Sequence, residues 1–181
     1  EVTIKKSDTL AKAISDNLDY VMGETLAIKL YFSEDLNEAE IIEFGTQSPI
    51  DPMRISDALR ADTARQIKAV LVTHVDTSTS IKNDIKEARA AIDAADHPAL
   101  LAVDCIASLC CDAFEMDAWG VDVMVAASQK GLMVPPGLAF VYFNEKAAEQ
   151  QHALERVSSY WNWKPRMNPE VFYQYFCGTA P

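Results

Sequence analysis

The stretch that decides the fold is residues 100–143, which read LLAVDCIASLCCDAFEMDAWGVDVMVAASQKGLMVPPGLAFVYF. It contains three short runs rich in Val, Leu and Ala, at residues 100–103, 121–127 and 138–143. Runs this short and this apolar are typical of strands buried inside a sheet. Helical patterns alternate with strand patterns in the rest of the chain. The sequence therefore predicts an α/β fold of three layers, α/β/α, around a mostly parallel sheet.

Polar groups follow the first two runs at the point where each predicted strand ends. Asp104 comes directly after the first run, and Lys130 closes a Ser-Gln-Lys triplet after the second. Because the carboxyl ends of strands in an open α/β sheet face the ligand crevice, both residues are expected to share it. A desolvated lysine there can form a Schiff base with a carbonyl, and a carboxylate is the partner of a protonated pyridine nitrogen. Spacing alone leaves open a solvated lysine and a helix-capping aspartate.

Three motifs occur in order within this stretch: VDCIASL at 103–109, WGVDV at 119–123 and SQKGLMVPPGLAF at 128–140. Together they resemble the lysine region of class V aminotransferases, enzymes of fold type I that include the serine–glyoxylate and alanine–glyoxylate aminotransferases. The resemblance implies pyridoxal 5'-phosphate as cofactor. It implies that Lys130 forms the Schiff base and that Asp104 pairs with the pyridine nitrogen. It also implies that Ile106 packs on one face of the ring and that Gln129 lies near the phosphate.

A second polar loop, residues 73–80 with the sequence THVDTSTS, follows a predicted strand at residues 67–72 and precedes a helical pattern. This order places functional loops on one side of a sheet. The loop resembles the second cofactor segment of the same family, which implies that the Thr77 hydroxyl contacts the phenolic oxygen of the ring. Ser80 stands where the family usually has glycine, which matters if the backbone there needs a positive φ.

His74 lies in this loop with Asp76 two residues away, a pattern that also suits a metal ligand or a general base. No second histidine lies nearby in the sequence, and His97 and His152 fall on predicted helix ends or surfaces. We therefore predict no metal site. His74 is expected to support the residues that bind the cofactor without contacting the cofactor itself.

The last segment, residues 160–181, is aromatic and interrupted by proline, which favours an interface over a substrate wall. It resembles the segment by which one subunit of these aminotransferases reaches the phosphate of its dimer partner. The resemblance implies that Thr179 contacts that phosphate and that the protein is a homodimer with a shared site. Phe176 stands where relatives commonly place a tyrosine.

Composition excludes several other classes of protein. The chain has 181 residues, 49% of them hydrophobic, and a formal net charge of −11. Such a charge argues against nucleic acid and anionic membranes as partners. No stretch reaches transmembrane length and the first residues do not read as a signal peptide, so a soluble, cytoplasmic protein is expected. The four cysteines lack zinc spacing, and we expect reduced thiols that serve as small apolar residues beside the core.

The remaining patterns predict further helices and strands. A helix is expected at residues 7–22, with strands at 26–32 and 39–44. Asp51 and Pro52 open another helix, whose buried side includes Met53. An apolar stripe at residues 81–95 predicts a helix packed on the sheet, and Asn144 caps a last helix that runs to about residue 157.

The resemblance to the family implies three parts and one function. Residues 1–39 form an N-terminal part that does not match the family, residues 40–159 a partial large domain that binds pyridoxal phosphate, and residues 160–181 the interface segment. The implied function moves an amino group from a small amino acid, preferably serine or else alanine, to glyoxylate or a similar 2-oxo acid. The alternatives are a non-catalytic module of this fold, and a related class V lyase or desulfurase that uses a cysteine nucleophile.

Overall fold

The computed structural model describes residues 2–5, 30–33, 47–154, 157 and 162–163. The chain divides into two compact units, which are described separately here. The first comprises Glu1–Ile41 and Arg156–Asn162, and the second comprises Ile42–Glu155 and Trp163–Pro181. In the first unit, β1 (Val2–Lys5) pairs in parallel with β2 (Leu30–Ser33). The predicted strand at 26–32 overlaps β2, whereas the predicted helix at 7–22 and strand at 39–44 lie outside the described residues.

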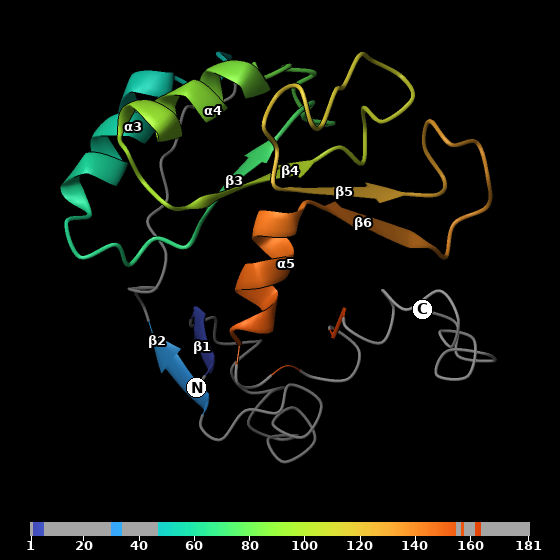
Figure 1. Cartoon of the computed structure of the whole chain (residues 1–181). Helices are drawn as coiled ribbons and strands as arrows, with labels where there is room; N and C mark the ends of the chain where they lie inside the picture. Colours follow the sequence, from blue (N-terminus) through green and yellow to red (C-terminus); the bar gives the residue numbers. More distant parts are fainter. Residues whose placement is uncertain (1, 6–29, 34–46, 155–156, 158–161, 164–181) are drawn as a thin grey trace. The chain divides into compact units, whose positions relative to one another are not determined.

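A four-stranded sheet forms the centre of the second unit (Figure 1). Its order is β3 (Ala69–Thr73), β4 (Leu100–Asp104), β5 (Val123–Ala127) and β6 (Ala139–Phe143). The first three strands run parallel and β6 is antiparallel to β5. All four strands were predicted, and each begins within two residues of its expected start. The α/β class and the mostly parallel sheet are thus confirmed.

Three helices accompany this sheet, and each begins at a side chain that accepts a free backbone N–H. They are α3 (Pro52–Ala61), α4 (Ile85–Ala94) and α5 (Glu145–His152), capped by Asp51, Asp84 and Asn144. The expected start of α4 at residue 81 was wrong, because the Asp84 carboxylate accepts the amides of Lys86 and Glu87. The last helix ends at His152, earlier than predicted. No helix in the described part of the chain is long and apolar enough to cross a membrane.

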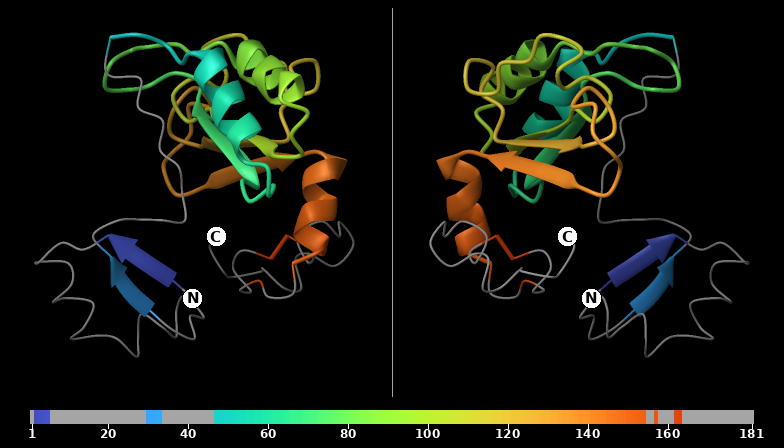
Figure 2. Two further views of the ribbon diagram at one scale, coloured as in Figure 1. Left: turned by 90° about the vertical axis from the view of Figure 1, so that its left-hand side faces the viewer. Right: turned by 90° about the vertical axis from the view of Figure 1, so that its right-hand side faces the viewer.

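Helices α3 and α4 lie together on one face of the sheet (Figure 2). That face carries the buried side chains of the strands, which are Val72, Leu101, Val103, Met124 and Ala126. Residues on the opposite face are partly or largely exposed, and Leu71 in β3 is 80% exposed. The alternation follows from the pleat, which sends successive side chains to opposite faces.

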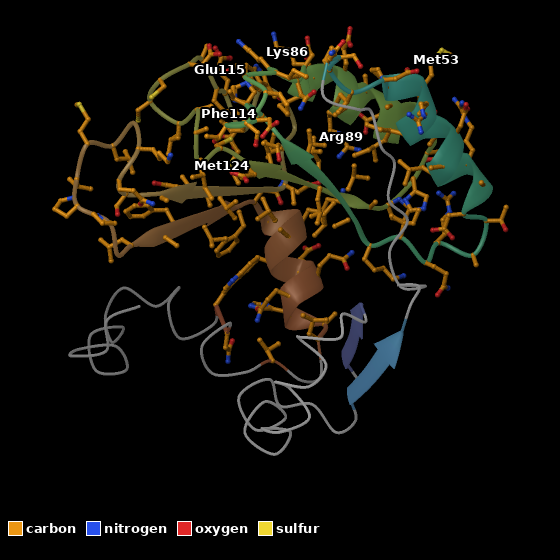
Figure 3. All side chains as sticks on the ribbon, turned by 180° about the vertical axis from the view of Figure 1, so that it is seen from behind. Met53, Lys86, Arg89, Phe114, Glu115 and Met124 are labelled. Atoms are coloured by element: carbon orange, nitrogen blue, oxygen red, sulfur yellow. The ribbon has the colours of Figure 1, made fainter. Side chains whose placement is uncertain are left out.

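Two side chains of this helical layer differ from their predicted environment. Met53 was expected on the buried side of α3, but it is 72% exposed and lies at the outer edge of the helix layer (Figure 3). Ile55 and Leu59 supply the buried side instead. His97 was expected at a helix end or surface; it follows the end of α4 but is buried, where its ring bonds to Asp62 at 3.3 Å and to the backbone amide of Ala99 at 3.2 Å.

A buried carboxylate at the start of β5 joins several elements. Asp122 is 3% exposed, and one carboxylate oxygen accepts the Leu101 amide of β4 at 2.8 Å. The other oxygen accepts the side-chain amide of Asn144, the cap of α5, also at 2.8 Å. The Arg89 guanidinium of α4 lies 3.5 Å from the first oxygen. Since buried carboxylates are costly unless they are paired and hydrogen-bonded, these donors explain how Asp122 is accommodated.

Replacing Asp122 tests whether this junction stabilises the fold. We expect Asp122→Ala to lower the free energy of unfolding by about 3 kcal/mol, because it leaves buried donors unpaired. Asp122→Asn, which keeps an oxygen acceptor, should cost less. Urea unfolding measures both. The matched control is Asp117→Ala, which removes an exposed carboxylate five residues earlier. Equal losses at positions 117 and 122 would contradict this role for Asp122.

Candidate active site

Strands β3, β4 and β5 end at the same edge of the sheet. Thr73 pairs with Asp104, and Asp104 pairs with Val125, so the three parallel strands are in register near their carboxyl ends. Lys130 follows β5 three residues after Ala127, and Thr77 lies in the loop after β3. The structure therefore places Asp104, the last residue of β4, at the same edge as the two loops that carry Thr77 and Lys130. In α/β sheets this edge is where ligands bind.

Asp104 is partly buried at the last position of β4. Its Oδ1 accepts the backbone N–H of Ile106 at 2.8 Å, which fixes the orientation of the carboxylate. No described residue donates a hydrogen bond to its Oδ2. Asp104 belongs to the same register row as Thr73, on the face opposite the helices. One oxygen is thus held by the backbone, and the other is open to a ligand.

The turn that carries Lys130 is closed by Ser128, which is fully buried. The Ser128 amide donates to the carbonyl of Leu138 at 3.1 Å, and its hydroxyl donates to the carbonyl of Pro135 at 2.7 Å. Gln129 and Lys130 are exposed. Within the described residues, no carboxylate forms an ion pair with the Lys130 ammonium. The loop therefore presents Lys130 while its base is anchored to the start of β6.

Gly131 packs the lysine turn against the turn that follows Asp104. A Cβ atom at this position would overlap the carbonyl oxygen of Leu109 and would lie 2.8 Å from the Cys111 Sγ. Real Cβ atoms do not approach other atoms so closely, so only glycine fits here without a shift of the backbone. This contact brings Lys130 next to the turn at residues 105–112.

The loop after β3 is organised by Asp76. Its carboxylate accepts the amides of Ser78 and Thr79 at 3.1 and 3.2 Å, and the Thr79 hydroxyl donates to it at 2.6 Å. These bonds, led by the one from the Thr79 hydroxyl, lower the pKa of the Asp76 carboxyl. Thr77 lies within this turn and is exposed. Asp76 was not predicted to have a role, although an aspartate that bonds to the backbone two residues ahead is a recognisable turn signal.

The backbone of this loop is left-handed at Ser80, where φ is +60°. Ser80 stands where the family usually has glycine, and this positive φ explains why glycine is favourable at that position. A residue with a side chain pays about 1–2 kcal/mol in this conformation, whereas glycine adopts it freely. The Ser80 amide donates to the Asp76 carbonyl at 2.8 Å, which holds the turn closed.

His74 is 1% exposed and its ring Nδ1 lies 2.9 Å from the hydroxyl oxygen of Ser108. Phe114 and Trp119 wall the ring, with centroids 5.4 and 5.9 Å away. Burial lowers the pKa of His74, and the nearby Lys82 ammonium lowers it further. The imidazole is therefore neutral near pH 7. Among the described residues, no group of three or more His, Cys, Asp or Glu side chains could hold a metal ion.

The cysteines occupy two environments. Cys105 is buried, and burial raises the pKa of its thiol to about 11, so it carries no nucleophilic thiolate at neutral pH. Cys110 and Cys111 are exposed free thiols, which corrects the expectation that the cysteines are small apolar residues beside the core. Cys177 lies outside the described residues. A desulfurase reaction through Cys105 is therefore disfavoured.

Of the remaining predicted site residues, Ile106 lies within the described part of the chain and Thr179 does not. Ile106 is half-buried beside Asp104, as a residue that packs on a bound ring needs to be. Thr179 and Phe176 lie outside the described residues. Of the aromatic tail, Trp163 is described, and its ring stacks on Phe143 of β6 with centroids 4.3 Å apart.

The mostly parallel sheet, the lysine after β5 and the carboxylate at the end of β4 together define an α/β protein with a candidate cofactor site at the carboxyl edge of its sheet. Comparison with known proteins specifies the family. Residues 35–168 match the family described as aminotransferase class-V. The chain therefore belongs to the class V aminotransferase family, as its motifs predicted.

Individual relatives agree with this assignment. Over 106 residues the chain is 50% identical to the L-aspartate–glyoxylate aminotransferase of Paracoccus denitrificans, covering 59% of this chain and 26% of that protein. Over 140 residues it is 43% identical to the serine–glyoxylate aminotransferase of Methylorubrum extorquens, covering 74% of this chain and 34% of that protein. The chain thus spans about a quarter to a third of the length of these relatives.

A solved structure shows the same fold. The ureidoglycine–glyoxylate aminotransferase of Bacillus subtilis matches with a TM-score of 0.63 and 22% sequence identity. The match covers 95% of this chain and 39% of the other. At this level of identity the likeness concerns the fold alone.

The left-handed backbone at Ser80 leads to a stability prediction. Ser80→Gly should raise the free energy of unfolding by about 0.5–1 kcal/mol, because the relief of strain exceeds the added freedom of the unfolded chain. Ser78→Gly in the same loop is the control, since its φ is not positive, and it should be neutral or destabilising. Urea unfolding compares the variants. A gain at Ser78 equal to that at Ser80 would refute the backbone explanation.

The close packing at Gly131 leads to a second prediction. Gly131→Ala should cost about 1–3 kcal/mol, because the new methyl group forces the two turns apart. Hydrogen exchange should also become faster at the amides of Cys111 and Asp112, which bond to the Ser108 carbonyl. Gly137→Ala is the control for the exchange readout: its positive φ of 132° strains the variant locally, but a Cβ there meets nothing within 4 Å, so exchange at Cys111 and Asp112 should not change. If both variants accelerate exchange equally at these amides, the packing argument fails.

Proposed function

We propose that this protein is a pyridoxal phosphate-dependent aminotransferase that moves an amino group from a small amino acid to glyoxylate or a similar 2-oxo acid. One observation carries the proposal. Asp104 ends β4 and Lys130 follows the adjacent parallel strand β5, and Gly131 packs the lysine turn directly against the turn after Asp104. The relatives named above support glyoxylate as acceptor, since that word is common to their names.

The described residues fit the cofactor on chemical grounds. A protonated pyridine nitrogen needs a carboxylate whose position is fixed and whose second oxygen is open, and Asp104 meets both conditions. Ile106 offers apolar surface beside that carboxylate. The exposed Lys130 amine has no competing ion pair among the described residues. Thr77, Gln129 and Thr179 would contact the phenolic oxygen and the phosphate, as the family resemblance implies.

Bound pyridoxal phosphate supplies an electron sink that stabilises negative charge at the substrate α-carbon. The chain supplies the remaining chemistry. With the cofactor bound, Lys130 Nζ would act as the base that removes the proton from the substrate α-carbon and as the acid that delivers it to the C4′ carbon of the cofactor. Asp104 keeps the pyridine nitrogen protonated, because a nearby negative charge stabilises the protonated form. Thr77 donates its hydroxyl hydrogen to the phenolic oxygen and so orients the ring.

The choice of amino donor belongs to this proposal as well. We keep serine as the preferred donor, with alanine as the second, because the motifs around Lys130 resemble bacterial serine–glyoxylate enzymes. Relatives carry names with different donors: aspartate in one and serine in two that are 43% identical.

We also propose a homodimer in which Thr179 reaches the partner's phosphate, and a cytoplasmic location.

Borohydride reduction of the full-length protein tests the lysine assignment. The purified protein should show a yellow absorption band with pyridoxal phosphate, and reduction should fix the cofactor on the peptide that contains Lys130. Lys130→Ala should lower the transamination rate by at least about 10³-fold, as expected for loss of the general acid and base. The matched control is Lys68→Ala, which removes another exposed lysine.

Each result has a definite meaning. Normal transamination by the Lys130→Ala protein would exclude Lys130 as the acid and base. A parent protein that takes up no pyridoxal phosphate would favour the non-catalytic alternative. Once activity is established, serine, alanine and aspartate should be compared as donors by their kcat/KM values with glyoxylate. A clear preference for aspartate would replace serine in the proposal.

A further inference from the structure

One buried residue joins the three segments that surround the predicted cofactor site. The backbone N–H of His74 donates to the carbonyl of Asp104 at 2.9 Å, and its own carbonyl accepts the amide of Asn83 at 2.8 Å. The ring Nδ1 bonds to the Ser108 hydroxyl at 2.9 Å. His74 therefore connects the end of β4, the end of the loop that carries Thr77 and the turn after Asp104.

Ser108 occupies the centre of that last turn. Its amide donates to the Cys105 carbonyl at 3.1 Å, and its carbonyl accepts the amides of Cys111 and Asp112, both at 2.9 Å. The turn begins at the carboxylate of Asp104, which holds the Ile106 amide. A displacement of Ser108 would therefore move the backbone on which Asp104 and Ile106 depend.

Water is kept from the bond between His74 and Ser108, because both side chains are almost completely buried. Phe114, labelled in Figure 3, and Trp119 both pack against the His74 imidazole. Their own ring centroids lie 5.1 Å apart. Lys86 of α4 lies over Trp119, with its ammonium 5.3 Å from the ring centroid. A hydrogen bond in such surroundings is costly to leave unmade.

A second contact between the same loop and turn lies at the surface. The ammonium of Lys82 is 2.7 Å from the carboxylate of Asp112, and about half of the lysine side chain is exposed. Exposed ion pairs contribute little to stability. In the described part of the chain, the bond from His74 to Ser108 is the only buried side-chain hydrogen bond between the loop at 73–83 and the turn at 105–112.

We propose that His74 and Ser108 form a positioning pair that sets the carboxylate of Asp104 and the hydroxyl of Thr77 for cofactor binding. The proposal rests on the proposed function. In this proposal, neither the His74 nor the Ser108 side chain contacts the cofactor ring. They act through the two loops, whose placement must be correct to within about 0.5 Å for a preorganised site.

Four variants of the full-length protein distinguish the effect of the hydrogen bond between His74 and Ser108 from the effect of side-chain packing. His74→Phe keeps a ring but loses Nδ1, and Ser108→Ala loses the hydroxyl. His74→Asn places an amide near the position of Nδ1, and Ser108→Thr keeps the hydroxyl. The control is Lys82→Met, which removes the surface ion pair.

Cofactor affinity is the first measurement, made by titrating each cofactor-free variant with pyridoxal phosphate and following the visible band. We expect His74→Phe and Ser108→Ala to bind about tenfold more weakly, which corresponds to the loss of one buried hydrogen bond. His74→Asn and Ser108→Thr should recover most of the affinity, and Lys82→Met should resemble the parent. Equal affinity in all variants would overturn the proposal.

Hydrogen exchange in the cofactor-free protein gives an independent measurement. The amide of Ile106, which bonds to Asp104, should exchange about tenfold faster in Ser108→Ala. The Leu101 amide at the other end of β4, which bonds to Asp122, should not change. Equal acceleration at both amides would show general destabilisation and would overturn the proposal. If the parent takes up no pyridoxal phosphate, both the proposed function and the role in cofactor binding fail, whereas the exchange measurement still shows whether the bond between His74 and Ser108 orders the turn after Asp104.

Discussion

The parallel pairing of β3, β4 and β5 in one register is the constraint on which the rest of this structure depends. It aligns Thr73, Asp104 and Val125 in one row, so that the loops after the three strands meet at one edge. A slip of one residue would turn Asp104 to the opposite face, under α3 and α4. The Asp122 carboxylate, which holds the Leu101 amide, fixes the same pairing at the amino end of β4.

Two aspartates on neighbouring strands show how position in the sheet determines chemistry. Asp122, at the amino end of β5, is buried and receives hydrogen bonds on both oxygens, so its charge is used to join elements. Asp104, at the carboxyl end of β4, receives the Ile106 amide on one oxygen and keeps the other open. Only the second arrangement can accept a ligand. The sheet thus holds a structural carboxylate at one edge and a candidate functional one at the other.

The three loops at the carboxyl edge share an unusual backbone feature. Each contains a non-glycine residue with positive φ: Ser80 after β3, Cys110 after β4 and Met133 after β5. Such residues cost about 1–2 kcal/mol apiece, and Arg65 and Asp96 adopt the same conformation in the loops before β3 and β4, at the amino edge. The surrounding hydrogen bonds hold the strained turns in place, notably those of Asp76, Ser108 and Ser128. The edge is therefore a set of fixed turns, consistent with a preorganised binding site.

The sequence by itself determined the features that depend on neighbouring residues. Short apolar runs located all four strands of the sheet, Asp51 and Asn144 marked helix starts, and the motifs around Lys130 gave the family. Tertiary structure decided the contacts between distant residues. The ring of His74 meets Ser108 across 34 positions, Gly131 packs on Leu109, and His97 is buried because Asp62 lies beside it. Periodicity and spacing report how a segment folds locally, but only the assembled sheet brings loops from separate strands together, and the candidate site consists of those loops.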